Sequence, residues 1–598
     1  MKPTNVGNPE YYHKVVDCQF ACPAHTPVPE YIRLIAAGRY TDAYMINWES
    51  NVFPGILGRT CDRPCEPACR RGRVEDKPVA ICRLKRVCAD FKDEIKERLP
   101  KIPEQKNGFH VALVGGGPAS LTVARDLMPL GYEVDLYEAT AKVGGFMRQQ
   151  IPSFRLPEKV IDEETGYILD MGVNTFLDTR VESMKELLGK GYDAVFVGSG
   201  APSGRVLKLP GYELDGGENI QVGVEWLSQV AFGHLTEAPK EVVVLGGGNT
   251  AMDCCRTALR LGAENVKVVL RTPIDAMVAS PWEIEETQAE GIPILENHNP
   301  REYVVDEDGT LKAIKFEIIE YSVAGDGTEV FTPTGREETV ECNLVLLAIG
   351  QANTFPWIER DIGIEFNEPG LAQVDGLTFQ STHPKVFFGG DAAFGPKNII
   401  TAVAQGHQAA LSIDLFLNGQ DLKNRPGPGT NLISQKMGIH DWSYASAVTE
   451  EERHAVPHVD LDEAIHSHTM EVELGFDAAT AIEEAQRCLN CDVETVFTAD
   501  KCIECDACID VCPVDCLTFS ENDEEAALRR KLNVPAHNLS QPIYVSQNLS
   551  TGRVMVKDED VCLHCGLCAE RCPTAAWDMQ KFLYISPRAG APLEEKSQ

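Results

Sequence analysis

Residues 484–516 read EAQRCLNCDVETVFTADKCIECDACIDVCPVDC and hold seven of the chain's 21 cysteines. Four of these cysteines follow the spacing C-x2-C-x2-C-x3-C-P, and residues 562–573 repeat that spacing. Thiolate sulfur is a good ligand for iron, and two-residue gaps let one tight loop present three sulfurs to a single cluster. Two such runs predict two [4Fe–4S] clusters near the C-terminus, with zinc knuckles as the alternative.

The two runs are expected to share their ligands. In two-cluster ferredoxins, the cysteine that precedes the proline binds the cluster of the other run. The region 496–598 is therefore predicted to be a ferredoxin-like domain, and the insert between its runs, with a helix-like segment and a strand hairpin, is predicted to dock a partner. The predicted ligand sets are Cys502, Cys505, Cys508 and Cys572 for one cluster, and Cys562, Cys565, Cys568 and Cys512 for the other.

Composition excludes several classes of partner. The chain has 598 residues and a formal net charge of −35, which argues against nucleic acid or an anionic membrane and favours a basic docking protein. Its first residues lack the apolar core of a signal peptide, and no apolar run is long enough to span a bilayer. Cysteines in cluster spacing without a secretory signal predict a cytoplasmic protein of several domains that is not bound to a membrane.

Residues 1–105 are predicted to form a helical domain, with helix-like segments near residues 30–37 and 41–47. Its many thiols indicate metal binding rather than disulfides in a reducing compartment. Residues 59–86 also contain nine basic and four acidic side chains. They form either a solvated basic face or a group of cations that compensates anionic clusters and raises their potential. The thiols are those of Cys18, Cys22, Cys61, Cys65, Cys69, Cys82 and Cys88.

Residues 110–127, HVALVGGGPASLTVARDL, read as a buried strand, a glycine turn and a helix. Gly115, Gly117 and Ser120 match the G-x-G-x-x-S form of the fingerprint in which glycines let a pyrophosphate approach a helix N-terminus. The next strand ends at Glu138, where an acidic side chain is expected to accept a hydrogen bond from an adenosine ribose. The pattern therefore predicts a Rossmann-like dinucleotide-binding fold.

A second copy of this unit lies inside the first. Residues 241–259, EVVVLGGGNTAMDCCRTAL, again place glycines between a strand and a helix, and Cys254 and Cys255 read as small buried residues rather than a redox pair. Two nested folds suggest a flavin and a nicotinamide nucleotide held face to face. The FAD domain is predicted at residues 106–212 and 351–424, and the NAD(P) domain at residues 213–350. The contacts predicted for the second nucleotide are Gly246, Gly248, Asn249, Thr250, Arg271 and Gly350.

The chain returns to the first fold through the strands NLVLLAIG and KVFFGGDAAF. Gly390 and Asp391 follow the second strand, and Ala402 lies in the next helix. Asp391 is expected to hold the ribityl chain or the pyrophosphate of FAD, with the positive end of the helix dipole facing the flavin.

The residues at the end of the strand before residue 271 partly indicate which nicotinamide nucleotide binds. No acidic residue follows that strand to bind ribose hydroxyls, and only Arg271 is available to pair a 2′-phosphate. Because the next residue is Thr272 rather than a second cation, the sequence favours NAD(H) over NADP(H).

Residues 425–495 are predicted to be a linker, because they open with RPGPGT and show little periodicity. A linker of this length is expected to wrap the other domains. Its histidines are irregularly spaced, so they are interpreted as part of a solvated segment rather than a metal site. It ends with Cys488 and Cys491, which belong to neither ferredoxin run.

The order of these parts resembles the iron–sulfur flavoproteins of the glutamate synthase small-subunit type. It is also similar to the large subunit of ferredoxin–NADP transhydrogenase and the N-terminal half of dihydropyrimidine dehydrogenase. The resemblance covers about residues 18–415 and rests on CPAHTPVPEYI, GRTCDRPCEPACRRG, VGGGPAS, VGGFM, IPSFRLP, GGGNTAMD and GGDAAFGP. It implies a multidomain α/β protein and an FAD-dependent NAD(P)H:acceptor oxidoreductase with no catalytic side chain. It also adds Gly144, Gly145 and Arg155 to the expected FAD contacts.

The resemblance extends to the clusters of the helical domain. The family usually begins that domain with EA-x-RCL-x-C, which here stands at residues 484–491. This implies one cluster on Cys18, Cys69, Cys488 and Cys491, and another on Cys22, Cys61, Cys65 and a fourth ligand. Relatives place Glu or Gln near the position of Lys85, which cannot serve as an anionic ligand, so Cys82 is expected to replace it. The alternative is that Cys82, Cys488 and Cys491 are free thiols. Four [4Fe–4S] clusters are expected in total.

The whole chain also resembles the iron–sulfur flavoprotein associated with dissimilatory sulfite reductase in sulfur-oxidising bacteria. This implies a function in sulfur metabolism, with sulfite reductase as the redox partner that docks at the ferredoxin-like domain. The alternatives are a glutamate synthase small subunit and an electron-input subunit of a 2-oxoacid oxidoreductase or benzoyl-CoA reductase. A homodimer is one expected assembly.

Overall fold

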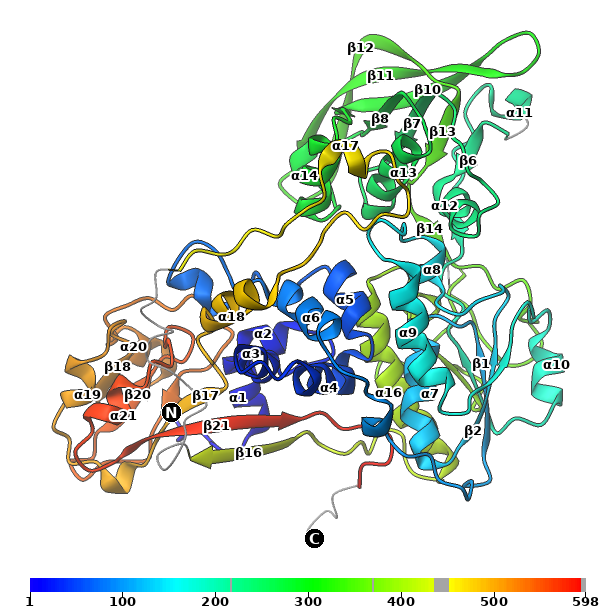
Figure 1. Ribbon diagram of the computed structural model, residues 1–598. Helices are drawn as coiled ribbons and strands as arrows, with labels where there is room; N and C mark the ends of the chain where they lie inside the picture. Colours follow the sequence, from blue (N-terminus) through cyan, green and yellow to red (C-terminus); the bar gives the residue numbers. More distant parts are fainter. Residues whose placement is uncertain (216–217, 368–369, 435–450, 593–598) are drawn as a thin grey trace. The chain divides into compact units, whose positions relative to one another are not determined.

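The computed structural model describes residues 1–215, 218–367, 370–434 and 451–592 (Figure 1). The chain divides into two compact units. The cysteine unit comprises Met1–Leu99, Asn424–Val456 and Gly475–Gln598, and the Rossmann unit comprises Pro100–Lys423 and Pro457–Leu474. Residues 435–450 of the predicted linker, with His440 among them, lie outside the described residues.

The N-terminal part of the cysteine unit is helical, as predicted. The helix expected near residues 30–37 is α3, which has prolines at its start and is followed by Gly38 with φ +70°. The helix expected near residues 41–47 is α4. The elements are α1 (Pro9–Val15), α2 (Asp17–Ala21), α3 (Val28–Ala36), α4 (Tyr40–Asn51), α5 (Pro54–Thr60), the 3-10 turn η1 (Arg70–Arg73), α6 (Ile81–Asp90) and the 3-10 turn η2 (Lys96–Arg98).

The end of the predicted linker is a structured part of this helical domain. Helix α18 (Ala478–Gln486) packs against α3 and α6. The buried carboxylate of Glu484 accepts hydrogen bonds from the backbone N–H of Ala80 at 2.7 Å and from Arg487 Nη1 at 2.6 Å. Arg33 of α3 forms a two-pronged ion pair with Asp492, at 2.6 and 2.5 Å. These contacts bring Cys488 and Cys491 to the N-terminal thiols.

The ferredoxin-like part is built from two small antiparallel sheets. One has the strand order β16-β21-β17 and the other β18-β20-β19, in which the predicted hairpin is present as β19 and β20. The helix predicted in the insert is α20. The elements are β16 (Gly429–Ser434), β17 (Val493–Phe497), the 3-10 turn η6 (Ala499–Lys501), α19 (Ala507–Asp510), β18 (Leu517–Ser520), α20 (Glu525–Arg529), β19 (Tyr544–Val545), β20 (Val554–Lys557), α21 (Leu567–Arg571) and β21 (Trp577–Ile585).

The Rossmann unit contains the two predicted folds, one inside the other. The first has a parallel sheet of order β15-β4-β1-β2-β3. Its edge strand β15 comes from the part of the chain that follows the inserted second fold. Its helices α7 and α16 pack against each other. The elements are β1 (His110–Val114), α7 (Pro118–Leu127), η3 (Met128–Leu130), β2 (Glu133–Tyr137), α8 (Phe146–Gln149), α9 (Glu158–Leu169), β3 (Asn174–Phe176), α10 (Met184–Gly189), β4 (Ala194–Val197), β15 (Val386–Phe388), α15 (Asp391–Phe394) and α16 (Ile399–Leu417).

The second fold has a parallel sheet of order β6-β13-β7-β8-β9 and an antiparallel sheet of order β10-β11-β12, which the sequence did not predict. The chain enters the second fold through β5 and leaves it through β14, and these two strands pair with each other. The elements are β5 (Ser203–Gly204), α11 (Tyr212–Asp215), β6 (Ile220–Val222), α12 (Gly223–Ala231), β7 (Glu241–Leu245), α13 (Asn249–Arg260), β8 (Asn265–Val269), η4 (Ile274–Ala276), α14 (Pro281–Ala289), β9 (Ile294–Leu295), β10 (His298–Val305), β11 (Leu311–Val323), β12 (Glu329–Glu341), β13 (Leu344–Leu347) and β14 (Gln351–Ala352).

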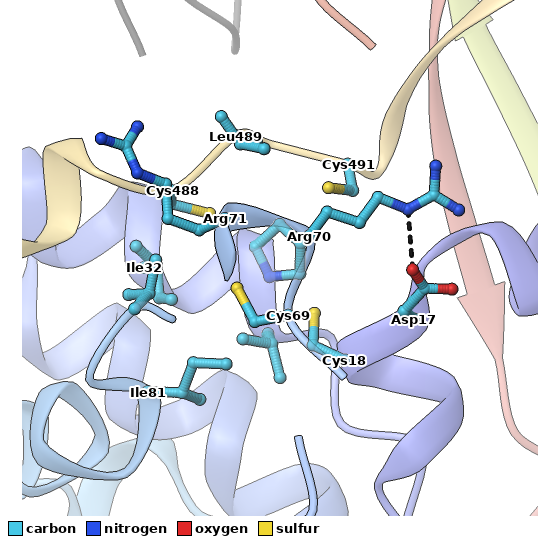
Figure 2. Close-up of a pocket in the computed structure, with 13 residues that line it drawn as sticks. Asp17, Cys18, Ile32, Cys69, Arg70, Arg71, Ile81, Cys488, Leu489 and Cys491 are labelled. Atoms are coloured by element: carbon cyan, nitrogen blue, oxygen red, sulfur yellow. Dashed lines mark hydrogen bonds and ion pairs between the residues drawn. The ribbon is translucent and has the colours of Figure 1, made fainter. Parts of the chain in front are cut away.

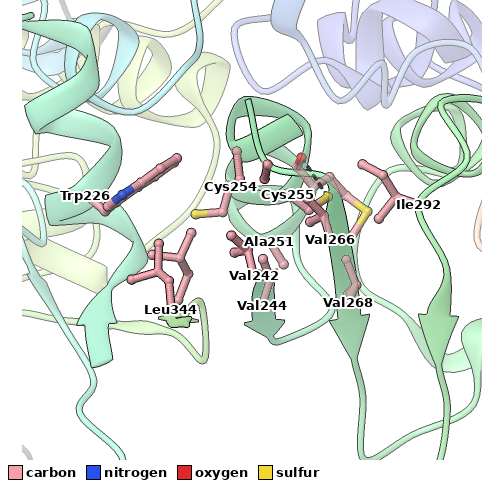
Figure 3. Packing of buried hydrophobic residues seen from close by; sticks show 14 of the residues in the cluster. Trp226, Val242, Val244, Ala251, Cys254, Cys255, Val266, Val268, Ile292 and Leu344 are labelled. Atoms are coloured by element: carbon pink, nitrogen blue, oxygen red, sulfur yellow. Dashed lines mark hydrogen bonds between the residues drawn. The ribbon is translucent and has the colours of Figure 1, made fainter. Parts of the chain in front are cut away.

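The core of the second fold lies between α12, α13 and the central strands (Figure 3). Trp226, Val244 and Val268 are fully buried there, together with Cys254 and Cys255. Both cysteines are free thiols. The reading of this pair as small buried residues is confirmed.

The Rossmann unit also includes residues 457–474 of the predicted linker. This segment carries α17 (Leu461–Ala464), and the backbone N–H of Val472 donates to the carbonyl of Phe154 at 2.9 Å. Phe154, Ala464 and Val472 form a small buried cluster. In the parts of the chain that are described, no helix has the length and apolarity required to cross a membrane.

Candidate functional site

The first glycine loop has the close packing that its fingerprint requires. Gly115 has φ +93°, and a side chain there would place Cβ 2.8 Å from the carbonyl oxygen of Gly198. Gly117 precedes the first turn of α7. Gly145 has φ +52°, and its Cβ would lie 2.9 Å from the Cα of Gly117, while the N–H of Gly144 donates to the carbonyl of Gly116. The two glycine motifs therefore form one tight backbone surface at a helix N-terminus.

Glu138 directly follows β2, and its carboxylate is turned to this loop. Its Oε2 accepts a hydrogen bond from the N–H of Gly116 at 2.7 Å, and its Oε1 accepts from the N–H of Thr140 at 2.8 Å. This is where the ribose of a dinucleotide is expected. Ser120 is fully buried, and its Oγ would lie 2.2 Å from a Cβ on Gly198. Ser120 therefore stands where α7 packs closely against the sheet.

The loop after β15 places a partly buried carboxyl, that of Asp391, at the edge of the first fold. Burial raises the pKa of Asp391 to about 6, although its side chain accepts a hydrogen bond from the N–H of Lys397. Ala402 is buried in the first turn of α16. Asn353, which the sequence analysis missed, donates to the carbonyl of Asp391 at 2.5 Å, and its buried Oδ1 has no partner among the described residues. The only feature of the sequence that could have pointed to Asn353 is its position three residues after Gly350.

The second glycine loop repeats the geometry of the first. Gly246 has φ +134°, and a Cβ would lie 2.2 Å from the carbonyl oxygen of Ala348. Gly248 precedes α13, whose first residues are Asn249 and Thr250. Asn249 accepts a hydrogen bond from the N–H of Ser280 at 2.7 Å, so it ties the loop to the start of α14.

Arg271 lies just beyond β8 and is exposed. Its guanidinium carbon is 5.0 Å from the centre of the Phe331 ring. Gly350 follows β13 with φ +109°. The position after β8 is where the adenosine ribose of a second nucleotide would be recognised.

Arg155 is paired with the second fold instead of a glycine loop. Its guanidinium forms ion pairs of 2.5 Å with Asp253 of α13 and with Glu283 of α14. All three side chains are almost fully buried. The predicted contact between Arg155 and FAD stays a prediction, and the visible role of this arginine is to join the two folds.

Four predicted ligands of the helical domain line one pocket (Figure 2). We call Cys18, Cys69, Cys488 and Cys491 the Cys18 set. Figure 2 shows the sulfurs of Cys18 and Cys69 facing those of Cys488 and Cys491 across a common space. Burial and the neighbouring thiols raise the pKa of Cys18. Buried thiols at this density, without disulfides, suit an iron–sulfur cluster, because the metal binds them as thiolates.

Four more thiols of this domain also lie together. In the Cys22 set (Cys22, Cys61, Cys65 and Cys82), a hydrogen bond from Cys61 lowers the pKa of Cys82 to about 6. Lys85 is buried beside them. Its burial opposes the charge, but the thiols of Cys61, Cys82, Cys65 and Cys22 raise its pKa above the usual value. Cys82 therefore stands among the other three thiols, and its role as a fourth ligand stays a prediction.

The basic residues of 59–86 are not a solvated face. Most of them are buried inside the cysteine unit, which favours the alternative in which they compensate negative charge at the clusters. The buried members are Arg63, Arg70, Arg71, Arg83, Lys85 and Arg86.

The ferredoxin-like part brings the remaining thiols into two sets. The Cys562 set (Cys512, Cys562, Cys565 and Cys568) lines one pocket. In the Cys502 set (Cys502, Cys505, Cys508 and Cys572), partial burial raises the pKa of Cys502, and the thiols of Cys572 and Cys505 raise it further. Cys505 is exposed. Cys516, which the sequence analysis left unassigned, lies 3.6 Å from Cys512 in the pocket of the Cys562 set.

Comparison with known proteins agrees with this arrangement. The model of the pyridine nucleotide-disulphide oxidoreductase family matches residues 109–406. Residues 12–97 match dihydropyrimidine dehydrogenase domain II with its 4Fe-4S cluster, and residues 501–576 match the 4Fe-4S dicluster domain.

Curated relatives cover most of the chain. The NADP(+)-dependent formate dehydrogenase subunit beta of Moorella thermoacetica is 34% identical over 79% of this chain and 70% of its own length. The NADPH-Fe(3+) oxidoreductase subunit beta of Geobacter sulfurreducens is 30% identical over 82% of this chain and 77% of its length. The glutamate synthase [NADPH] small chain of Azospirillum brasilense is 32% identical over 67% of this chain and 86% of its length. The chain therefore belongs to the glutamate synthase small-subunit-like family of iron–sulfur flavoproteins, and it is an FAD-dependent NAD(P)H oxidoreductase of electron transfer.

Proposed function

We propose that this chain exchanges electrons between a nicotinamide nucleotide and a redox protein, using one FAD and four [4Fe–4S] clusters. The observation that carries the proposal is the grouping of sixteen thiols into the Cys18, Cys22, Cys502 and Cys562 sets in a chain that also has two nested dinucleotide folds. FAD, when bound, converts a two-electron hydride step into single-electron steps, which a nicotinamide alone does not do readily.

The protein's part in this function is to bind and position its cofactors. The first glycine loop, Glu138 and Asp391 would hold FAD, and the second glycine loop with Asn249 would hold the nicotinamide nucleotide. No side-chain acid, base or nucleophile is needed for a hydride to pass between two stacked rings. The bound nucleotides are therefore expected to be oriented by backbone N–H groups at helix N-termini.

NADP(H) is the nucleotide that we propose. Thr272 led the sequence to favour NAD(H), but the names of the formate dehydrogenase and Fe(3+) oxidoreductase relatives print NADP(+) and NADPH. The exposed guanidinium of Arg271 is held over the Phe331 ring, which leaves a cation available at the ribose position. A bidentate pair between this guanidinium and a 2′-phosphate would select NADP(H).

The electron partner is proposed to dock where the Cys502 set reaches the surface. Cys505 is exposed there, and the adjacent Ile503 has 62% of its surface exposed. The relatives are named as beta subunits, so the partner is proposed to be the catalytic subunit of a redox enzyme. Dissimilatory sulfite reductase stays a prediction, as do the homodimer and the cytoplasmic location. The glutamate synthase alternative is weaker, because that small chain matches only 67% of this chain.

The test is to purify the chain without oxygen, count iron and FAD, and add NADPH or NADH. We expect about sixteen iron atoms and one FAD per chain. NADPH should bleach the flavin at lower concentration than NADH, and Arg271→Ala should raise the KM for NADPH with little effect on that for NADH. Flavin that neither nucleotide bleaches would refute the proposed function, and about eight iron atoms would refute the two sets of the helical domain.

A further inference from the structure

The loops of the Cys18 set and the Cys562 set touch each other inside the cysteine unit. We propose that single electrons pass directly between these two sets, and that Arg70 and His564 are the positioning residues of that step. The inference rests on the proposed function, which supplies the electrons. It adds an order: the helical domain delivers to the ferredoxin-like domain through the Cys562 set, before the Cys502 set, whose Cys505 is exposed.

His564 is the closest link between the two sets. It lies in the turn between Cys562 and Cys565, with φ +53° and a fully buried side chain. Its backbone N–H donates to Cys562 Sγ at 3.4 Å, and its Nδ1 lies 2.9 Å from the carbonyl oxygen of Cys491. A carbonyl can only accept, so Nδ1 carries the proton in this contact. One residue therefore binds a sulfur of the Cys562 set and the backbone of a Cys18-set ligand.

Arg70 makes the second link. It directly follows Cys69, lines the pocket of the Cys18 set and is only 1% exposed (Figure 2). Its Nε pairs with Asp17 at 2.8 Å. Its Nη1 donates to the carbonyl of Cys562 at 2.7 Å and to the carbonyl of Glu559, and lies 3.4 Å from His564 Nε2. Because Nδ1 of His564 holds the proton, its Nε2 is free to accept from Arg70.

These contacts form a continuous hydrogen-bonded bridge. It runs from Arg70 to His564 Nε2 and from His564 Nδ1 to Cys491, and the side chains of Arg70 and His564 are buried. Electron transfer between two centres slows steeply as the gap between them widens, so packed and dry contact favours it. The step moves one electron from one set to the other, makes and breaks no bond and requires no proton.

The charge of Arg70 has a second effect. A guanidinium at the edge of both sets stabilises the more negative, reduced form of each cluster, and burial strengthens that interaction. Its Nη2 is buried with no hydrogen-bond partner among the described residues, so part of its charge is not matched by a donor–acceptor contact. Removing the charge should therefore lower the midpoint potentials of the two neighbouring clusters.

The experiment compares variants that leave the cysteines and the backbone in place. Arg70→Met keeps an unbranched apolar side chain and removes the charge. His564→Gly removes the bridge without strain at positive φ, whereas His564→Asn keeps a side-chain N–H and also tolerates that φ. Arg39→Met is the control, because Arg39 belongs to the same unit and pairs with Asp42 at a solvent-exposed site.

The reduced clusters are followed by electron paramagnetic resonance after rapid mixing with NADPH. Flavin bleaching and iron content should be unchanged in every variant. Reduction of the ferredoxin-like domain should slow roughly ten- to hundred-fold in Arg70→Met and His564→Gly, and His564→Asn and the control should behave as wild type. Potentiometric titration should show lowered midpoint potentials in Arg70→Met.

Two results would overturn the inference. One is full iron with wild-type transfer rates and potentials in both Arg70→Met and His564→Gly. The other is a reduced wild-type protein whose spectrum shows no magnetic interaction between a helical-domain cluster and a ferredoxin-domain cluster, which settles the matter even if a variant loses iron. Both differ from failure of the proposed function, in which the flavin itself is not bleached.

Discussion

Replacing Arg155 with Met should destabilise the Rossmann unit by several kcal/mol without changing its glycine loops. The guanidinium joins Asp253 and Glu283, which belong to the second fold, to the segment after α8 in the first. Residues this deeply buried lose water on folding, and their charges are acceptable only because they are paired.

The magnitude follows from which partner is left uncompensated. Glu283 would keep an ion pair with Arg256 at 3.2 Å, whereas Asp253 would lose its direct partner. Removing one member of a buried pair typically costs about 3–5 kcal/mol, so we expect a loss of about 3 kcal/mol for Arg155→Met. Adding Asp253→Asn removes the stranded charge and should recover a large part of that loss.

The effect should depend on pH. Burial already raises the pKa of Asp253 and of Glu283 with Arg155 present, and the pKa of Asp253 should rise further without it. A carboxyl whose folded pKa is raised contributes stability that is present at low pH and is lost as the pH rises through the folded pKa. The deficit of Arg155→Met should therefore be smaller near pH 5 than near pH 8.

The assay is urea unfolding followed by tryptophan fluorescence, together with the FAD content of each variant. Lys240→Met is the control, because Lys240 pairs with Glu264 at an exposed site and its loss should not shift the midpoint. Equal stability of Arg155→Met and wild type would refute the reasoning. Loss of FAD with no loss of stability would instead show that Arg155 contacts the cofactor.

Three further predictions concern the cofactor sites. Cys488→Ala should lower the iron content by about four atoms per chain, while Cys88→Ala, which removes a buried thiol outside the four sets, should leave it unchanged. Gly246→Ala should abolish flavin bleaching by NADPH but retain FAD in absorbance spectra, because its Cβ would lie 2.2 Å from the carbonyl oxygen of Ala348. Burial raises the pKa of Asp391 to about 6, so the free energy of unfolding of the FAD-free protein should fall by up to about 3 kcal/mol as the pH rises from 4 to 7. Asp391→Asn should weaken this pH dependence in urea titrations.

The nested folds and the ferredoxin runs were predictable because their signals are local. Gly115 and Gly246 are each required by a backbone approach within one strand–turn–helix unit. No local signal indicates where Cys488 and Cys491 lie in the fold. They were inferred from resemblance alone, and the contacts that place them, such as Glu484 to the N–H of Ala80, join residues about four hundred positions apart.

The partners of charged residues were the least predictable feature. Arg155 stands in a stretch that suggested FAD, but its carboxylates come from helices of the other fold. His564 lies in a ferredoxin loop where only the cysteines carry a recognisable pattern, and its acceptor is 73 residues away. Such pairs depend on how folded domains pack, and neither spacing nor periodicity records that packing.

The buried cations also suggest why the helical domain and its clusters depend on each other. Lys85 is buried, and the groups that raise its pKa are the four thiols of the Cys22 set. An isolated buried ammonium is costly, so thiols that are anionic, as they are on a metal, would stabilise the folded domain. We therefore expect cluster insertion to be coupled to folding of the helical domain. Because Cys488 and Cys491 complete the Cys18 set, that coupling extends across nearly five hundred residues and links the helical domain to the start of the ferredoxin-like one.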